Sequence, residues 1–305
     1  MKTKFNPPIR AICNFFGGVI CAGAAILISS SAQAQNLFVA NAWANSILEF
    51  TPGGAQSTFA SGSSWAEGLA FNSAGDLFAS FPGNGGIVKF TPGGAQSTFA
   101  SGLSFPAGLA LNSAGDLFAA DVSGGNIYQF TPGGVKSTFA SGLSSPFGLA
   151  FNSTGDLFVS SYIYGSANIY EFTPGGVKSI FASGLSFPTG LAFNSAGYLF
   201  MSEANSGNIY EFTPTGVRST FASGLNAPQD LVFDDAGYLF EADANSGNIY
   251  EFTPAGVRSV FASGLGAHGL AFQGELLPVP EPPAFALLTV GAAALLVHRR
   301  RKLGN

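Results

Sequence analysis

Cysteine is nearly absent from this sequence. Its 305 residues include two, Cys13 and Cys21, and both lie in the first 34 residues. That segment has three basic residues near its start, then an apolar stretch, and ends in Ala32-Gln33-Ala34, the pattern of a secretory signal peptide that signal peptidase removes. We therefore expect an exported protein that has no disulfide, no thiolate nucleophile and no cysteine-based metal site.

Basic residues are scarce as well. Residues 35–276 contain sixteen Asp and Glu but five Lys and Arg, a net charge of minus eleven. A chain this acidic repels phosphate backbones and anionic surfaces. We therefore expect no nucleic-acid partner, whereas cations, neutral polymers and proteins stay open as partners.

Several motifs of enzyme chemistry are missing too. The chain has no phosphate-binding P-loop, no dinucleotide fingerprint, no serine elbow and no zinc-binding spacing. These absences argue against the enzyme classes that depend on such motifs.

The sequence does contain a repeat. The tripeptide Phe-Thr-Pro occurs six times, and each copy is followed at the same distance by Phe-Ala-Ser-Gly. Successive copies are 40, 40, 42, 40 and 40 residues apart. The copies begin at Phe50, Phe90, Phe130, Phe172, Phe212 and Phe252. This fixed period indicates a repeat architecture.

Each repeat divides into four short strands. In the copy at residues 147–182, segment 147–151 is apolar throughout, which is typical of a strand buried on both faces near a crowded axis. Segments 156–160, 168–172 and 177–182 follow, separated by turn residues such as Asn-Ser-Thr-Gly and Thr-Pro-Gly-Gly. Four strands per period correspond to one blade of a β-propeller.

The first blade is split between the two ends of the repeat region. Residues 37–40 match a second strand that has no innermost strand before it, and residues 269–272 match an innermost strand that has no second strand after it. The C-terminal strand can therefore complete the N-terminal blade and close a ring without exposed edges. We predict an all-β, six-bladed propeller over residues 35–276, monomeric, with the 31 Phe packing between blades. The expected blades are 269–272 with 37–60, 67–100, 107–140, 147–182, 189–222 and 229–262.

The hairpins between third and fourth strands contain charges at symmetric positions. Glu and Lys or Arg stand on either side of the Thr-Pro turn, and in the second blade Lys89 stands opposite Gln96. We expect opposite-charge pairs across the hairpin, each worth about 0.2 to 1 kcal/mol. The expected pairs are Glu171 with Lys178, Glu211 with Arg218, and Glu251 with Arg258.

The six copies differ on one face of the expected propeller. The Asn-Ser-Ala-Gly and Thr-Pro-Gly-Gly turns are nearly identical, whereas the connections after the second strand and before the innermost strand vary. These connections place aromatic and acidic residues around one mouth of the ring: Trp43, Trp65, Glu67, Phe81, Phe105, Asp121, Phe147, Tyr162, Tyr164, Phe187, Glu203, Gln229, Asp230, Asp243 and His268. We predict that the mouth binds the ligand. The predicted ligand-binding residues are Trp43, Trp65, Glu67, Tyr162, Tyr164, Gln229 and Asp230.

One stretch resembles known families. Residues 188–203, Pro-Thr-Gly-Leu-Ala-Phe-Asn-Ser-Ala-Gly-Tyr-Leu-Phe-Met-Ser-Glu, with Asn-Ile-Tyr-Glu-Phe at 208–212, are similar to the NHL repeat and more distantly to gluconolactonase and streptogramin-lyase propellers. The resemblance extends over residues 36–273. It implies the fold, and it leaves the activity open because these families include scaffolds, binding modules and enzymes.

The resemblance implies two catalytic interpretations. Glu67 before Gly68 matches the position where gluconolactonase-like proteins ligate a divalent metal, and calcium would suit such a site. The further Asn and Asp ligands of that family are not evident, and a carboxylate that caps a turn is the alternative. His268 could act as a general base, as in streptogramin lyases, or serve as a hydrogen-bonded structural residue. Repetition of Asp121, Glu203 and Asp243 favours turn capping over chemistry.

The C-terminal segment looks like a PEP-CTERM sorting tail read by an exosortase. A Pro-rich linker at 277–283 contains Val279-Pro280-Glu281-Pro282, and residues 284–305 comprise an apolar run and a basic end. The fourteen apolar residues 284–297 span about 21 Å as a helix, less than the roughly 30 Å hydrocarbon core, so they make a marginal permanent anchor. We expect membrane contact through this tail before processing; an ordinary single-span anchor is the alternative.

Together these features predict an exported propeller sorted to the cell surface, outer envelope or extracellular matrix of a Gram-negative bacterium. The preferred function is to bind or scaffold extracellular polysaccharide or protein. The near-identity of blades leaves little room for a specialised catalytic pocket. The alternative is a divalent-metal-dependent lactonase or lyase that uses the mouth.

Overall fold

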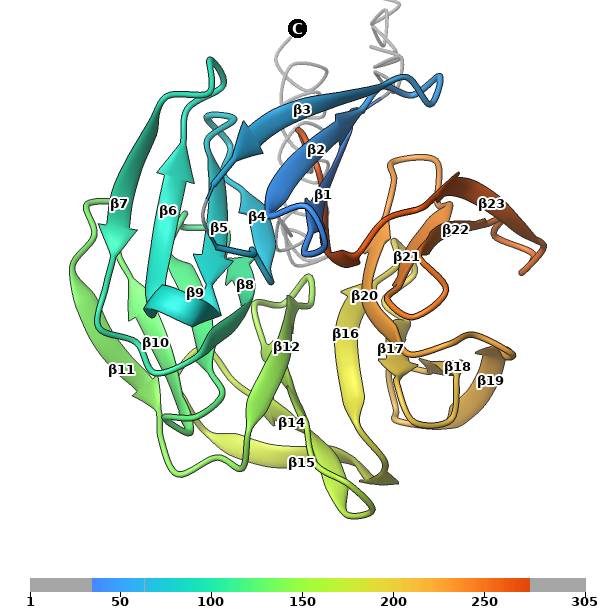
Figure 1. The fold of residues 1–305 in the computed structure, drawn as a ribbon. Helices are drawn as coiled ribbons and strands as arrows, with labels where there is room; N and C mark the ends of the chain where they lie inside the picture. Colours follow the sequence, from blue (N-terminus) through green and yellow to red (C-terminus); the bar gives the residue numbers. More distant parts are fainter. Residues whose placement is uncertain (1–34, 63, 275–305) are drawn as a thin grey trace, which may run out of the picture. The chain divides into compact units, whose positions relative to one another are not determined.

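A computed structural model describes residues 35–62 and 64–274 of the chain. Twenty-four strands form six four-stranded antiparallel sheets, which are arranged as blades around a common axis (Figure 1). The predicted all-β, six-bladed propeller is therefore confirmed. The signal segment 1–34 and the tail 277–305, with the Val279-Pro280-Glu281-Pro282 motif, lie outside the described residues.

Within each blade the strands run outward from the axis in sequence order, except that the last strand of the chain is the inner strand of blade 1. The innermost strands of blades 1 to 6 are β24 (Ala267–Phe272), β4 (Leu69–Phe71), β8 (Pro106–Leu111), β12 (Pro146–Phe151), β16 (Pro188–Phe193) and β20 (Pro228–Phe233). The second strands are β1 (Leu37–Asn41), β5 (Leu77–Phe81), β9 (Leu117–Asp121), β13 (Leu157–Ser161), β17 (Leu199–Glu203) and β21 (Leu239–Asp243). The third strands are β2 (Ser46–Phe50), β6 (Gly86–Phe90), β10 (Asn126–Phe130), β14 (Ala167–Phe172), β18 (Asn208–Phe212) and β22 (Asn248–Phe252). The outer strands are β3 (Gln56–Ser61), β7 (Gln96–Ala100), β11 (Lys136–Ala140), β15 (Lys178–Leu185), β19 (Arg218–Ala222) and β23 (Arg258–Ser263). A short 3-10 helix, η1 (Pro82–Asn84), connects β5 to β6 in blade 2.

The ring closes where β24 pairs with β1. The two strands are antiparallel, with Leu37 opposite Phe272. Backbone bonding continues at the end of the pair, where Ala42 N–H donates to the Gly266 carbonyl at 2.7 Å and Gly266 N–H donates to the Asn41 side chain at 3.0 Å. The predicted closure of blade 1 by the C-terminal strand is therefore confirmed.

Phenylalanines form the contacts between blades. In blade 1, the buried Phe38 ring meets Phe59 of its own outer strand at 5.0 Å and Phe71 of the next blade at 4.9 Å, both edge-to-face. Phe59 in turn meets Phe90 of blade 2 at 5.8 Å. Such pairs contribute about 0.5 to 1.5 kcal/mol each beyond the area they bury. Comparable contacts recur around the ring, so the Phe residues hold neighbouring blades together.

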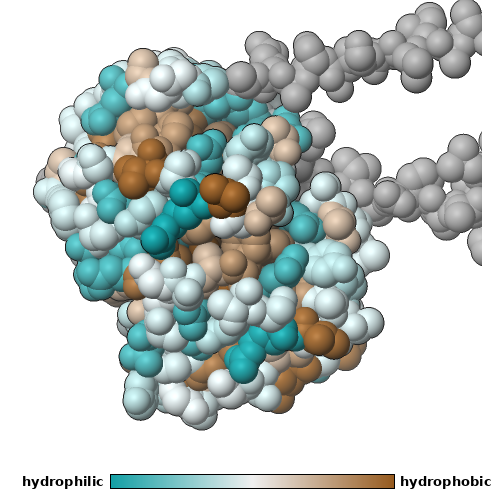
Figure 2. Space-filling view, turned by 90° about the vertical axis from the view of Figure 1, so that its right-hand side faces the viewer, coloured by the Kyte–Doolittle hydropathy of each residue, from teal (hydrophilic) through white to brown (hydrophobic). Residues whose placement is uncertain are grey.

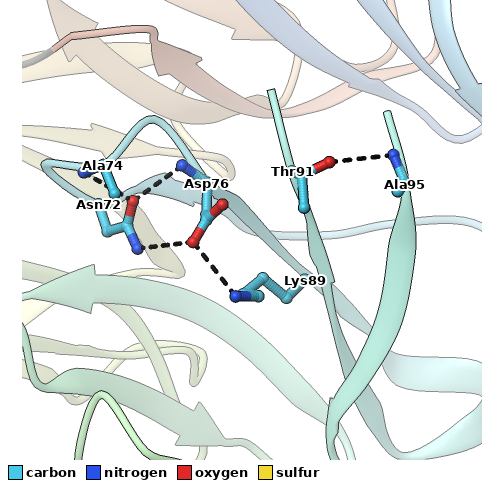
Figure 3. Close-up of polar contacts among 6 residues, drawn as sticks. All are labelled: Asn72, Ala74, Asp76, Lys89, Thr91 and Ala95. Carbon is cyan, nitrogen blue, oxygen red and sulfur yellow. Dashed lines mark hydrogen bonds and ion pairs between the residues drawn. The ribbon is translucent and has the colours of Figure 1, made fainter. Parts of the chain in front are cut away.

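The repeated turns on one face are held by side chains that bond the local backbone (Figure 3). The Asn72 side-chain oxygen accepts N–H bonds from Ala74 at 3.0 Å and Asp76 at 2.8 Å. In the turn between β6 and β7, on the same face, the Thr91 hydroxyl accepts the N–H of Ala95 at 3.2 Å. These bonds replace backbone partners that a turn lacks, which explains why Asn and Thr recur at these positions.

The predicted charge pairs across the outer hairpins are wrong by one residue. Lys178 lies opposite Phe172, and Glu171 lies opposite Ser179. The cause is a backbone bond from Thr173 N–H to the Val177 carbonyl, which makes the loop five residues long. The same shift separates Glu211 from Arg218 and Glu251 from Arg258.

The cations of these hairpins lie over tyrosine rings instead. The distances to the ring centroid are 5.2 Å for Lys178 over Tyr170, 4.8 Å for Arg218 over Tyr210 and 4.9 Å for Arg258 over Tyr250. Lys136 lies over Tyr128 in the same way. The fifth cation, Lys89, bonds Asp76 at 3.2 Å rather than facing Gln96 (Figure 3). All five contacts are made within blades, so the basic residues belong to blade structure.

The outer surface of the ring has both polar and apolar side chains. Figure 2 shows the side that carries blades 5 and 6, where tan and brown areas lie between white and teal ones. The exposed hydrophobic residues include valines in the turns just before the outer strands, such as Val217 and Val257. Single exposed apolar residues of this kind are ordinary on a protein surface. Among residues 35–62 and 64–274, no helix is both long and apolar enough to cross a membrane.

Blade 6 has a buried acid in the contact with blade 5. Glu241 is fully buried on β21, and neither carboxyl oxygen has a hydrogen-bond partner among the described residues. The matching positions of the other second strands are apolar: Val39, Ala79, Ala119, Val159 and Met201. Burial, reinforced by the nearby Asp243 charge and only partly offset by Arg258, raises the pKa of Glu241 well above its ordinary 4.5. The carboxyl is therefore protonated in the folded protein at pH values where the unfolded chain has lost the proton.

Ring closure can be tested by truncation. A chain that ends at Gly264 lacks β24, so β1 loses its inner partner and Phe240 loses the Phe272 ring at 5.1 Å. We expect cooperative thermal unfolding, followed by circular dichroism, to be lost. A control chain that ends at Gly274 should unfold cooperatively like the full chain. Equal cooperative melting of both truncated chains would contradict the closure.

Glu241 should weaken the fold in a pH-dependent way. Because its pKa is raised on folding, the free energy of unfolding should fall as pH rises above about 4.5, where only the unfolded chain releases the proton. Glu241→Met, which copies Met201 of blade 5, should raise the free energy of unfolding at pH 7 by about 1 to 3 kcal/mol and make that decline shallower. The reverse control, Met201→Glu, should destabilise the protein. Denaturant unfolding between pH 4 and 8 measures both effects, and an unchanged pH profile in Glu241→Met would disprove the assignment.

Candidate functional site

The innermost strands approach each other so closely at the axis that five of the six blades have glycine there. A Cβ atom on Gly68 would collide with the Ala107 carbonyl of the next blade, and one on Gly148 would collide with the Thr189 carbonyl. Glycine is required because only a residue without a side chain lets the backbones approach this far. The five residues are Gly68, Gly108, Gly148, Gly190 and Gly269, and blade 6 has Asp230 instead.

A hollow of about 310 Å³ lies at one mouth of this channel. Its walls come from the connections before the inner strands, from the first residues of inner strands, and from the connections after the second strands of several blades. The lining residues are Trp65, Glu67, Phe105, Val122, Ser123, Phe147, Tyr162, Gln229 and His268. A narrower space of about 40 Å³ adjoins it between the axial glycines, and it shares Glu67, Phe147, Gln229 and His268 with the hollow. The hollow is large enough for a small molecule or one unit of a polymer.

Glu67 and His268 form an ion pair at the floor of the hollow. The Glu67 Oε2 and His268 Nδ1 atoms are 3.0 Å apart, although the two residues come from opposite ends of the repeat region. The pair joins blade 2 to the inner strand of blade 1. Glu67 is 7% exposed, and its backbone N–H donates to the Ser80 carbonyl at 3.0 Å.

The ion pair changes the protonation of the histidine. Partial burial lowers the pKa of His268, but the hydrogen bond from the ring to Glu67 and the Glu67 charge outweigh this, so the pKa lies above its ordinary 6.5. The imidazole is therefore held in its protonated form further toward neutral pH than a free histidine.

Asp230 lies in the narrow channel next to this pair. Its two carboxyl oxygens accept N–H bonds from Leu231 and from Leu270 of blade 1, each at 2.9 Å. Loss of contact with water raises the pKa of Asp230, the two backbone bonds lower it, and the Glu67 charge raises it again, which places the pKa at about 7. Asp230 therefore gains or loses a proton near neutral pH.

Four aromatic rings wall the hollow in two pairs. The Trp65 and Phe105 ring centroids are 6.0 Å apart on one side, and the Phe147 and Tyr162 rings stack at 5.0 Å on another. Trp65 also lies 5.9 Å from the His268 ring. Partial burial, with a smaller effect of the Glu67 charge, raises the pKa of Tyr162, so its hydroxyl keeps its proton.

Buried carboxylates hold several of the loops that lead into the inner strands. Asp121 accepts N–H bonds from Ser104 at 3.0 Å and Phe105 at 2.7 Å. Glu203 and Asp243 bond the N–H groups of equivalent loops, those of Ser186 at 2.8 Å and Asn226 at 2.6 Å. These three acids thus bond the loop backbone, the arrangement expected of turn capping.

The structure brings together most of the predicted mouth residues. Trp65, Glu67, Tyr162, Gln229 and His268 line the hollow, and Asp230 lines the channel below it. Val122 and Ser123 also line the hollow and were not predicted. They directly follow Asp121 at the end of β9, so their position after a second strand was the available signal.

Trp43 and Tyr164 do not belong to this lining. The Trp43 ring is 63% exposed and packs beside Gly247 and Gly266 of the neighbouring connections. Tyr164 is 71% exposed and contacts Phe187, with ring centroids 5.8 Å apart. Both therefore lie outside the hollow.

The residues at the floor do not form an evident metal site. Within residues 35–62 and 64–274, no three or more His, Cys, Asp or Glu side chains are grouped to hold a metal ion. One oxygen of Glu67 is already bonded to His268 at 3.0 Å, which leaves fewer free oxygen atoms for a cation that needs several, such as calcium. The predicted calcium site at Glu67 stays a prediction.

No protein-family model matches this chain, and no curated protein matches it in sequence. Solved structures do resemble it. A chain of a nidogen/laminin complex has a TM-score of 0.73 and 19% identity, over 78% of this chain and 98% of the other. A streptogramin B lyase has a TM-score of 0.63 and 18% identity, over 78% and 86% of the two chains. A gluconolactonase from Xanthomonas campestris has a TM-score of 0.63 and 17% identity, over 78% and 88%.

At these identities the similarity shows the fold alone. The structural part of the predicted resemblance is confirmed, because the neighbours are six-bladed propellers of the NHL, gluconolactonase and streptogramin-lyase type. One neighbour comes from a protein complex and two are named as enzymes. The fold is therefore compatible with both the binding and the catalytic prediction.

Proposed function

We propose that this propeller binds extracellular polymer, polysaccharide or protein, through the hollow at its mouth. The observation that carries the proposal is the hollow of about 310 Å³ walled by Trp65, Phe105, Phe147 and Tyr162. Partly exposed aromatic rings offer flat apolar faces with polar edges, which stack on sugar rings or grip an extended peptide. They are also the residue types that dominate binding energy at interfaces.

The polar groups of the hollow suit recognition of a ligand with hydrogen-bonding groups. Gln229, Tyr162 and the Glu67–His268 pair line the same space as the aromatic walls. A small number of polar groups among apolar walls is the usual composition of a binding site. The propeller's acidic charge favours neutral or cationic ligands over anionic ones.

A lactonase or lyase is the second candidate, favoured by the contact between Glu67 and His268. A carboxylate that orients an imidazole is a common arrangement for acid–base catalysis. Here the carboxylate raises the pKa of His268, which favours the protonated acid over the neutral base that proton abstraction needs. Binding is therefore the better supported function.

We also propose that the protein is exported and then sorted to the cell surface or matrix, as residues 1–34 and the Val279-Pro280-Glu281-Pro282 motif predict. In a bacterium that has an exosortase, the mature protein should begin near residue 35 and should have lost the residues beyond Pro282. Mass spectrometry of the surface-bound protein measures both ends. An intact C-terminus on that protein would contradict the sorting proposal and support a retained anchor.

Substitutions at the mouth test the binding proposal. Trp65→Ala and Tyr162→Ala each remove one aromatic wall, so we expect affinity for matrix polymer to fall by about tenfold or more. The matched controls are Trp43→Ala and Tyr164→Ala. Each removes a side chain of the same type that lies outside the hollow, so both variants should keep the parent's affinity. Binding is measured by co-sedimentation with purified matrix, alongside the melting temperature of every variant.

Two outcomes would contradict this proposal. Equal binding by the two mouth variants and the parent would place binding elsewhere. Turnover of a lactone or depsipeptide that is abolished by Glu67→Gln or His268→Ala would assign the mouth to catalysis.

A further inference from the structure

Among the described residues, His268 is the one basic side chain that lines the hollow. The five Lys and Arg of the propeller all lie on third or outer strands, where four are stacked on tyrosines and Lys89 bonds Asp76. The lining of the hollow contains neither residue type. A positively charged ligand would therefore meet no side-chain ammonium or guanidinium group in the hollow.

The floor beneath the aromatic walls has an excess of carboxyl groups. Glu67 balances the charge of His268 at 3.0 Å, and Asp230 adds a second carboxyl in the adjoining channel. Asp230 replaces the glycine found in the other five blades, and its carboxyl is bonded to two N–H groups but to no cation among the described residues. Above about pH 7, where Asp230 is ionised, the floor therefore has one negative charge more than its single cationic side chain balances.

The walls above this floor attract cations in a second way. The face of an aromatic ring is negative, and a cation within about 6 Å of the ring centre gains about 0.5 to 2 kcal/mol. Trp65 and Tyr162 have the rings with the strongest effect of this kind, and both line the hollow with Phe105 and Phe147. Several rings around one acidic floor form the arrangement that recognises alkylated ammonium groups.

Resting on the binding function proposed above, we propose that the hollow selects ligands by an organic ammonium group held between the aromatic walls and the Glu67 floor. Such a group can be the amine of a deacetylated amino sugar, the side chain of lysine or a quaternary ammonium. A bare metal ion fits less well, because it requires several converging oxygen ligands, whereas an alkylammonium is satisfied by ring faces and one or two carboxylates.

A pair of probes that differ only in charge tests the proposal. Choline and 3,3-dimethylbutan-1-ol have nearly the same shape, but only choline is charged. Calorimetric titration of the purified full chain should show choline binding at least about tenfold more tightly than the neutral alcohol. Equal affinities, or tighter binding of the alcohol, would overturn the ammonium proposal.

Variants locate the effect in the hollow. Trp65→Ala should weaken choline binding through the lost ring face, and Glu67→Gln should reduce the preference for choline over the alcohol. The controls are Trp43→Ala, outside the hollow, and Glu171→Gln, an acid on an outer hairpin; both should bind choline like the parent. Loss of choline binding in the controls but not in the mouth variants would overturn the assignment to the hollow.

Polymers distinguish the natural sources of the group and separate this proposal from the binding function. Glucosamine oligomers, N-acetylglucosamine oligomers and lysine-containing peptides serve as probes. Tighter binding of the glucosamine oligomers than of the acetylated ones indicates an amino sugar, and preference for the peptides indicates a protein; both outcomes support the ammonium group. Equal binding of acetylated and deacetylated oligomers, still weakened by Trp65→Ala, would reject the ammonium proposal and leave the binding function intact.

Discussion

The whole ring depends on the close packing of one blade against the next. Near the axis, glycines such as Gly68 and Gly148 allow the backbones of neighbouring inner strands to meet. Further out, Phe38 and its counterparts fill the same contact with edge-to-face ring pairs. Each blade is buried only by its neighbours, so no blade is stable alone and the ring must close. The C-terminal strand β24 is therefore required first for the fold, because it closes the ring, and only then for the site.

Closure also creates the site. The chain positions of Glu67 and His268 differ by 201 residues, and only the return of β24 to blade 1 brings their side chains within 3.0 Å. The connections on the two faces of the ring differ in how much their sequences can vary. Turns on one face are bound by their own Asn and Thr side chains, which keeps them alike. Connections on the other face surround the channel and can vary without disturbing contacts between blades, so a hollow with its own chemistry arises there.

The sequence was sufficient to predict the fold, because the period and the split first blade are visible in one dimension. It also placed Glu67 and His268 at the same mouth of the ring. It could not predict hairpin register, because one backbone bond from Thr173 to Val177 moves Lys178 away from Glu171. The sequence also could not predict side-chain direction. Trp43 and Trp65 both lie in mouth connections, yet Trp43 packs on glycines outside the hollow and Trp65 lines it.

Blade 6 departs from the repeat at two positions, the fully buried Glu241 and the partly buried Asp230, and the difference between them indicates which departure belongs to function. Glu241 has no partner for either oxygen among the described residues, and it lies between blades, away from the lining of the hollow. Asp230 also breaks the pattern, but both its oxygens are bonded and it adjoins the Glu67–His268 pair. Proteins violate their own local rules mainly where function requires it. A polar residue that is bonded in place beside the hollow fits that rule, whereas Glu241 is a cost to stability that the rest of the ring tolerates.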